Sequence, residues 1–178
     1  DHAATAKLVL GAVHTAGEPE LAVRESNWYG KRLVADESVV SSLSADDLGE
    51  VVIVGGTGKL GLDFCAEFAR AGAGRITLIS RSGGSVDAQA RIAEIAASGS
   101  TQVRVLTCDV TDADAVRALA EQFAGEPVDL LVHAAVDYAA SAEPTPDSIR
   151  AAAAPKIMAL DHLVSLLPRS AHGRVLLC

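Results

Sequence analysis

The sequence predicts an α/β protein built on a doubly wound parallel sheet. Three observations predict it: short Val- and Ile-rich runs typical of buried strands, helical patterns between these runs, and short connections. Strands that alternate with helices join by right-handed crossovers into a parallel sheet. In chain order, we expect strands at 51–54, 75–80, 103–108, 128–134 and 174–178, and helices at 59–71, 85–98, 112–124 and 146–167.

The first of these strands leads directly into a glycine-rich turn, in the segment VVIVGGTGKLG at 51–61. The spacing Gly56-x-Gly58-x-x-Gly61 alone is a weak signal, but the strand before it and the helix after it strengthen the interpretation. Glycines let the backbone approach a pyrophosphate, which then lies at the amide donors and positive dipole end of the following helix. We therefore predict a Rossmann-like nucleotide site that includes the six residues of the turn, Gly56, Thr57, Gly58, Lys59, Leu60 and Gly61.

A glycine turn with a lysine also invites comparison with a P-loop. That motif needs Gly-x-x-x-x-Gly-Lys followed by Ser or Thr. Here Leu60 follows the lysine, and Ile53 occupies the position of the first glycine. The sequence therefore excludes a P-loop ATPase.

Arg81 follows the second expected strand, 20 residues after Gly61. This fold places the group that contacts the adenosine ribose at that point. An NAD or S-adenosylmethionine site would carry Asp or Glu, but no carboxylate occurs between Arg75 and Gly84. A guanidinium instead offers a planar fork to a 2′-phosphate. We therefore expect NADPH as the cofactor; the alternative is that Arg81 is an ordinary solvated loop charge.

Composition limits the class of protein further. The 178 residues are 49% hydrophobic and carry a net charge of −8, which argues against nucleic acid or an anionic membrane as partner. No apolar run approaches the roughly 18 residues of a membrane span, and no signal peptide is evident, so we expect a cytoplasmic protein. Cys65 and Cys108 are expected to be small core residues, and no cysteine has metal-ligand spacing.

Residues 1–48 fall outside the alternating pattern, so we expect two domains, 1–48 and 49–178. In the first we expect a helix at 3–14, two strands within 20–35 around a turn at Ser26-Asn27, and a polar linker at 36–50 with capping residues near Ser44. Its apolar residues are expected to form an interdomain packing face: Leu21, Val23, Trp28, Leu33 and Val34.

The second domain contains five expected strands, whereas a complete two-half dinucleotide fold has six. Either the molecule continues beyond Cys178 or a partner completes the sheet; we expect continuation, so that the chain is a fragment.

Other polar residues have simpler interpretations. We expect His133 to be a packed, hydrogen-bonded imidazole rather than a general base, Asp63 to lie on a solvated helix face, and Asp129 to cap the strand at 128–134. In the helix at 85–98 we expect one buried side: Val86, Ala90, Ile92, Ala93 and Ala96.

Five short motifs in order resemble the ketoreductase domains of modular polyketide synthases, in the short-chain dehydrogenase/reductase superfamily. GGTGKLG at 55–61 is similar to the family's glycine turn, and ISRSG at 79–83 to its NADPH-reading turn, which implies roles for Ser80 and Arg81. CDVTD at 108–112 implies that Asp109 and Val110 lie at the adenine, and VHAA at 132–135 that Ala134 and Ala135 flank the ribose. PKIMALDHL at 155–163 resembles the lysine-bearing helix, and the segment at 18–35 resembles the end of the structural subdomain.

The resemblance implies NADPH-dependent reduction of a β-ketoacyl thioester carried by the phosphopantetheine of an acyl carrier protein, beside other synthase domains. Lys156 would be the catalytic lysine, which lowers the pKa of a tyrosine acid. The family's serine, tyrosine and asparagine would follow Cys178, so we expect this fragment alone to be inactive.

Two departures keep alternatives open. Val136 stands where the family usually has glycine, and Tyr138-Ala139-Ala140 replaces a Leu-Asp-Asp signature of one stereochemical class. The alternatives are an inert ketoreductase-like module kept for structure or docking and, more distantly, a free-standing NADP-dependent reductase or epimerase.

Overall fold

The computed structural model describes residues 2–13, 17, 20–25, 27–32, 43–136 and 145–178. The chain divides into two compact units, Asp1–Ser41 and Ser42–Cys178. The following expected residues lie outside the described residues: Ser26 of the turn, Leu33 and Val34, residues 36–42 of the linker, and Tyr138-Ala139-Ala140.

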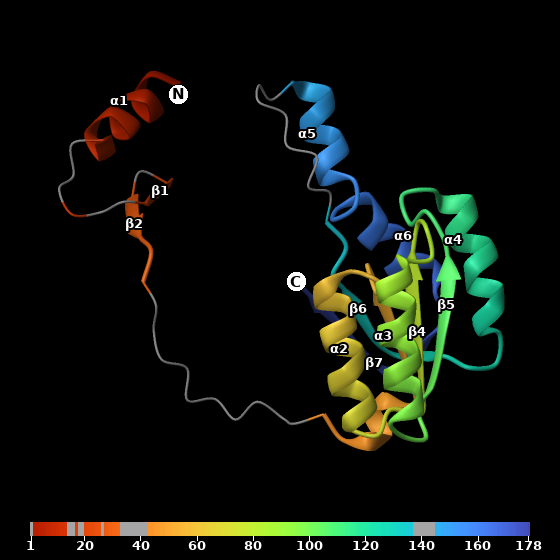
Figure 1. The fold of residues 1–178 in the computed structure, drawn as a ribbon. Helices are drawn as coiled ribbons and strands as arrows, with labels where there is room; N and C mark the ends of the chain where they lie inside the picture. The colour runs from red at the N-terminus through yellow and green to blue at the C-terminus, as the bar shows by residue number, and fades with distance from the viewer. Residues whose placement is uncertain (1, 14–16, 18–19, 26, 33–42, 137–144) are drawn as a thin grey trace. The chain divides into compact units, whose positions relative to one another are not determined.

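The first unit contains a helix and a two-stranded ribbon (Figure 1). Helix α1 (His2–Val13) is followed by β1 (Leu21–Arg24) and β2 (Asn27–Gly30), which pair antiparallel with Leu21 opposite Gly30. The helix approaches the ribbon at Gly11, where an added Cβ would lie 2.9 Å from the ring of Trp28. The expected helix and strand pair are therefore present.

The second unit contains a five-stranded parallel sheet in the order β5-β4-β3-β6-β7. Its central strand β3 (Glu50–Val54) is buried on both faces, as its continuous apolar run predicts. From β3 the chain builds outward through β4 (Arg75–Ser80) and β5 (Gln102–Thr107), and then returns to the other side of β3 with β6 (Val128–His133) and β7 (Arg169–Leu177). The predicted doubly wound sheet is confirmed.

Helices cover both faces of this sheet, and alternate strand residues separate its two cores. Figure 1 shows α2 (Lys59–Arg70) and α3 (Val86–Ala97) side by side. Their core includes Val51, Ile53, Cys65, Phe68, Ile76, Leu78, Ile92, Ile95, Leu130 and Val132.

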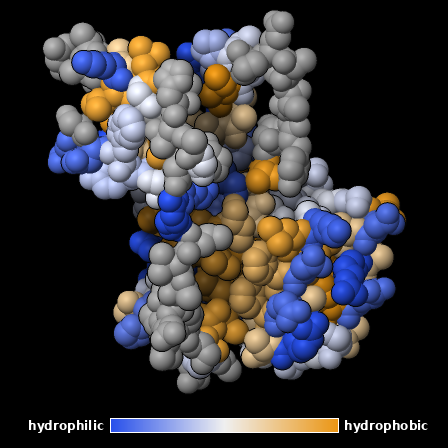
Figure 2. All heavy atoms as spheres, turned by 90° about the vertical axis from the view of Figure 1, so that its left-hand side faces the viewer, coloured by the Kyte–Doolittle hydropathy of each residue, from blue (hydrophilic) through white to orange (hydrophobic). Residues whose placement is uncertain are grey.

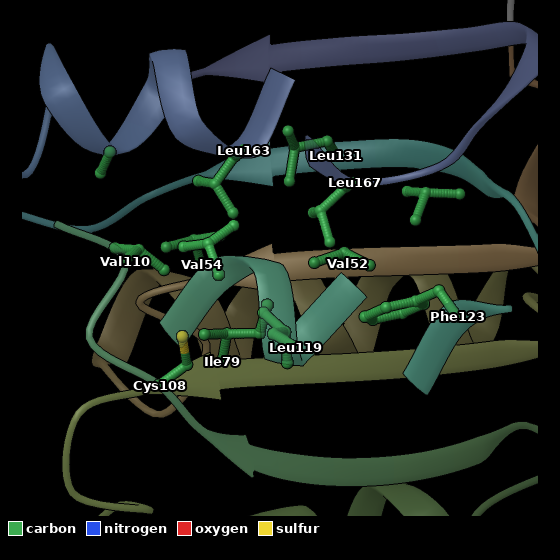
Figure 3. Packing of buried hydrophobic residues seen from close by; sticks show 13 residues of the cluster. Val52, Val54, Ile79, Cys108, Val110, Leu119, Phe123, Leu131, Leu163 and Leu167 are labelled. Atoms are coloured by element: carbon green, nitrogen blue, oxygen red, sulfur yellow. The ribbon is translucent and has the colours of Figure 1, made fainter. Parts of the chain in front are cut away.

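The opposite core is formed with α4 (Ala113–Ala120), the 3-10 turn η2 (Glu121–Phe123) and α6 (Met158–Leu166). Figure 3 shows Leu163 and Leu167 pointing toward Val52 and Val54 of the central strand. Cys108 belongs to this core, so both expected core cysteines are buried.

Four details of the expected fold are wrong. The helix expected at 146–167 is two helices, α5 (Pro146–Ala153) and α6, because Pro155 lacks the amide that a continuous helix needs and its ring clashes with the preceding turn. The last strand begins at Arg169 rather than at 174. Of the expected buried side of α3, Ile92 is buried, but Val86 is 85% exposed and Ala90 and Ala93 are also exposed; the helix buries Ala88 and Ile95 with Ile92.

The fourth difference lies at the end of the linker expected at 36–50, which is structured rather than a linker. Residues Ala45–Leu48 form the 3-10 turn η1, Leu48 is buried, and Glu50 already belongs to β3. The expected capping is present, since the Ser44 amide donates to Asp47 Oδ2 over 2.9 Å.

A buried polar network joins the amino ends of the strands. Thr77 donates to Glu50 Oε1 over 2.6 Å and accepts from Arg104 Nε over 2.7 Å, so one hydroxyl links three strands. Arg75 lies 3.3 Å from Glu50 Oε2 and also pairs with Glu126. Burial raises the pKa of Glu50, which the Thr77 hydrogen bond and the two arginines oppose.

Asp129 belongs to the same end of the sheet. It was expected to cap its own strand, but its Oδ2 accepts from the backbone amide of Glu50 over 2.9 Å. The carboxylate therefore bonds across the sheet to the start of β3.

The larger unit also exposes apolar surface. Figure 2 shows hydrophobic residues gathered on the side of this unit that faces the viewer, next to a strongly hydrophilic area. The edge strand β7 contributes exposed side chains from Val175, Leu176 and Leu177. None of the helices formed by described residues has both the length and the apolar character needed to cross a membrane.

Candidate functional site

A cleft of about 560 Å³ opens at the carboxyl ends of the central strands. Residues at or just beyond the ends of β3, β4, β5 and β6 line it. The sheet order reverses between β3 and β6, and open α/β sheets bind ligands at such a switch point. Ten of the predicted cofactor-binding residues line it: Gly58, Lys59, Leu60, Gly61, Ser80, Arg81, Asp109, Val110, Ala134 and Ala135.

The glycine-rich turn forms one wall of the cleft. The amides of Gly55 and Gly56 both donate to the backbone oxygen of Ile79, over 2.9 and 3.1 Å, which fixes the turn over the end of β4. Gly58 is the N-cap of α2, and the first helical bond runs from Leu62 to Gly58. The amides before Leu62 are therefore free of intrahelical partners, which suits them to an anion.

Gly61 allows this turn to be compact. A Cβ at this position would lie 2.4 Å from the backbone oxygen of Gly55 and 2.6 Å from Gly56 Cα. Any side chain would force the helix away from the turn. The third glycine of the motif therefore serves close packing between the strand and the helix.

Two of the predicted residues do not line the cleft. Gly56 lies beneath it, since its added Cβ would be 2.8 Å from Leu78 Cβ. Thr57 packs sideways against Gly84 of the next loop. Both residues shape the turn rather than its open wall.

The loop after β4 carries Arg81 into the cleft. Ser80 Oγ accepts from the Gly83 amide over 2.8 Å and so fixes the course of the loop. The Arg81 side chain is exposed, and it has no hydrogen bond or ion pair with any residue that the structure describes. Its guanidinium is therefore available to a ligand.

Asp109 faces the same cleft but has its own partner. Its Oδ1 accepts from the Thr111 hydroxyl and amide, over 2.7 and 3.0 Å. These two bonds lower the pKa of Asp109, and the charge of Arg81 adds to the effect. Asp109 is therefore an anion that can accept hydrogen bonds, for example from an amino group.

The loop after β6 forms the far wall. The Ala134 amide donates to the backbone oxygen of Val54 over 2.9 Å, which holds this loop against the central strand. Val136, 41% exposed, presents its side chain at this wall.

Lys156 lies in the turn between α5 and α6, beside the ends of β6 and β7. Its ammonium donates to the backbone oxygen of Cys178 and, over 3.5 Å, to that of His133. Pro155, the preceding residue, lines the cleft, whereas Lys156 does not. The predicted catalytic lysine is thus at the margin of the cleft.

His133 packs as expected, but the expected hydrogen bonding is wrong. The residue is 1% exposed, and neither ring nitrogen has a hydrogen-bond partner among the residues described. Burial lowers the pKa of His133, and the charge of Lys156 lowers it further. The imidazole is therefore neutral near pH 7.

The cleft also contains residues that were not among the predicted site residues. Asp63 is exposed, as expected for a solvated helix face, and it also lines the cleft from α2. Its spacing of four residues from Lys59 was the available signal, because such residues share a helix face. Thr111 follows Asp109 in the segment CDVTD just after β5, so the sequence already pointed to it, whereas Pro155 gave no such signal because it reaches the cleft only through the fold.

Comparisons with known proteins agree with this architecture. A protein-family model described as "KR domain" matches residues 49–178. The chain is 36% identical over 132 residues to polyketide synthase GfsA of Streptomyces halstedii, which covers 71% of this chain and 2% of the synthase. It is 34% identical over 139 residues to the pikromycin synthase component PikAIII of Streptomyces venezuelae, covering 76% of this chain and 9% of that protein.

Solved structures are similar as well. The ketoreductase from the first module of phoslactomycin biosynthesis in Streptomyces sp. HK803 has a TM-score of 0.73 and 33% identity, covering 94% of this chain and 40% of its own. The first ketoreductase of the tylosin synthase has a TM-score of 0.64 and 26% identity, covering 90% of this chain and 35% of its own. The chain thus spans a small part of the curated synthases and less than half of these ketoreductases. It belongs to the ketoreductase (KR) domain family of modular polyketide synthases, within the short-chain dehydrogenase/reductase superfamily.

Proposed function

We propose that this chain forms the NADPH-binding part of a ketoreductase domain that reduces a β-ketoacyl thioester on an acyl carrier protein to the β-hydroxyacyl thioester. The family supports an oxidoreductase that works beside other synthase domains. The observation that carries the cofactor assignment is Arg81, whose guanidinium lines the cleft at the end of β4 without a hydrogen bond or ion pair to any residue that the structure describes.

The cleft fits a phosphorylated dinucleotide. The first-turn amides of α2 suit a diphosphate, and the close packing at Gly61 brings the backbone within reach of it. Arg81 suits a 2′-phosphate because a guanidinium binds phosphate oxygens in a planar fork. Asp109 and Val110 would flank the adenine, and Ala134 and Ala135 the ribose.

When bound, the cofactor supplies the hydride for the carbonyl. The reduction also needs a proton for the alkoxide that forms. An acid can deliver this proton near neutral pH if a nearby positive charge lowers its pKa. Lys156 is proposed to supply the positive charge that lowers the pKa of this acid. The backbone oxygens of His133 and Cys178 hold its ammonium in place. An ammonium about 4 Å from a phenol oxygen gains up to about 4 kcal/mol at an effective dielectric near 20. That gain corresponds to roughly three pKa units.

The complete domain that contains this chain tests the proposal. With a β-ketoacyl thioester surrogate, it should oxidise NADPH and form the hydroxy product. Lys156→Met should lower kcat by about a hundredfold while leaving the Kd for NADPH unchanged. Binding of NADPH without any thioester reduction would count against the catalytic assignment.

One observation favours a second candidate. Val136 presents an exposed side chain at the far wall of the cleft, where bulk would crowd a nicotinamide ring. An inert ketoreductase-like module of the synthase would explain such crowding. If Val136→Gly creates activity that the unaltered domain lacks, the inert module is the better description.

A further inference from the structure

A histidine on α6 is bonded to the loop that follows β5. His162 Nδ1 lies 3.2 Å from the backbone oxygen of Val110, a residue 52 positions earlier in the sequence. A carbonyl oxygen only accepts, so Nδ1 must carry the proton and donate it to this bond. Val110 and its neighbour Asp109 line the cleft, whereas His162 does not. The imidazole can therefore act on the cleft only through the loop that it holds.

The packing of α6 brings His162 to this loop. Ala159 and Leu163 are the buried residues of the helix, and His162, three residues after Ala159, lies on the adjoining part of the same face. Val110 is buried in the same core as Leu163 (Figure 3). The helix face that packs into the core thus places the ring next to the backbone of Val110.

The bond holds the middle of the loop, whereas other hydrogen bonds hold its two ends. At the first end, the Cys108 amide donates to the backbone oxygen of Ser80 over 3.0 Å. At the second end, Asp112 caps α4 with its side chain. Between them, His162 satisfies the carbonyl of Val110. A carbonyl near the core that loses its donor is costly, so without His162 the peptide would turn toward water and change the course of the loop.

We propose that His162 is a positioning residue for the adenine end of the cofactor, because it fixes the Val110 carbonyl and with it the loop that carries Asp109. This inference rests on the proposed function, in which Asp109 and Val110 flank the adenine. It adds a residue outside the cleft on which the affinity for the cofactor depends.

The effect should be confined to cofactor binding. Lys156 lies in the turn before α6, and its ammonium is held separately by the backbone oxygens of His133 and Cys178. Loss of the bond from His162 leaves these contacts in place. Affinity for the adenine half of the cofactor should therefore fall while proton delivery continues.

The test compares the complete domain that contains this chain with its His162→Leu variant. Isothermal titration uses NADPH, adenosine 2′,5′-bisphosphate as its adenine half, and reduced nicotinamide mononucleotide as its other half. The variant should bind NADPH and the bisphosphate about fivefold more weakly, the effect of one neutral hydrogen bond, and should bind the mononucleotide within about twofold of the unaltered domain. The KM for NADPH should rise while kcat at saturating NADPH stays the same.

Two further variants isolate the role of the donor. His162→Asn keeps an N–H donor at the position that Nδ1 occupies along the side chain, so it should retain the affinity for all three ligands. His172→Leu is the matched control. This exposed histidine lies in the amino half of β7, between the residues that pair with Val128 and Leu130, whereas the cleft is at the carboxyl ends of the strands. The control should leave binding and kcat unchanged.

Each other outcome is decisive. An unchanged affinity of His162→Leu for the bisphosphate would overturn the inference. An equal loss for the mononucleotide or a fall in kcat would also overturn it, because His162 would then support the cleft as a whole. A loss in His162→Asn as large as in His162→Leu would show that the donor is not the cause.

Failure of the proposed function looks different, since the unaltered domain would then not bind NADPH at all. Thermal denaturation identifies any variant that does not fold. If His162→Leu does not fold, His162→Ala takes its place with the same expected results, because alanine favours a helix.

Discussion

Gly84 lies against Thr57, so close that a Cβ on Gly84 would be 2.9 Å from Thr57 Cβ. This contact joins the glycine-rich turn to the loop that carries Arg81. Gly84 also has φ +89°, a conformation that residues with a side chain rarely adopt. The position of Arg81 relative to the glycine-rich turn thus depends on a residue that only glycine suits.

Gly84→Ala should therefore lower the free energy of unfolding by about 2 kcal/mol, through strain at positive φ and the clash with Thr57. Chemical denaturation measures this change. Gly99→Ala is the control, because an added Cβ there has nothing within 4 Å and the backbone has no positive φ. Similar stabilities of the two variants would contradict the packing described here.

Thr77→Val tests the polar network at the opposite end of the sheet. The substitution keeps the shape of the buried side chain but removes the hydroxyl that donates to Glu50 and accepts from Arg104. Because buried partners are left unsatisfied, the variant should be less stable by about 1–3 kcal/mol. Thr107 is exposed, so Thr107→Val should change the free energy of unfolding much less. If Thr77→Val leaves the free energy of unfolding unchanged, the network does not stabilise the fold.

His133 should make stability depend on pH. Its pKa in the folded protein lies below its ordinary value of 6.5 because burial and Lys156 disfavour the charged ring. The unfolded chain therefore binds the proton more readily, and stability should fall as the pH drops below about 6.5. Denaturation at pH 7.5 and 5.5 should show a smaller difference for His133→Leu than for the unaltered chain.

The exposed His172 provides the comparison for that experiment. His172→Gln should keep the full pH dependence. If His133→Leu and the unaltered chain lose the same stability between the two pH values, the buried ring is not the cause.

The sequence predicted most of the sheet because burial on both faces selects continuous β-branched runs. The central strand is an example, since its residues Val51, Val52, Ile53 and Val54 are all buried. The glycine-rich turn after it was a further signal in the sequence. The edge strand β7 was less predictable. Its first residues, RSAHG, are mostly exposed and show no apolar pattern. Of these five, only Arg169 is paired with β6, before a register shift after which the pairing resumes at Arg174.

The helix interruption at Pro155 was missed for a different reason. Alanines at 151–154 favour helix strongly, and the local pattern continues on both sides of the proline. The cleft itself was predictable where its residues follow strand ends, as for Arg81 and Asp109. It was not predictable where a residue arrives through packing of distant segments, as for Pro155.

Binding of NADPH and NADH to Arg81→Asp measures whether the Arg81 side chain binds the 2′-phosphate of the cofactor. The substitution should weaken NADPH by about 2 kcal/mol or more, roughly thirtyfold, and leave NADH unchanged. Equal losses for the two nucleotides would contradict the assignment.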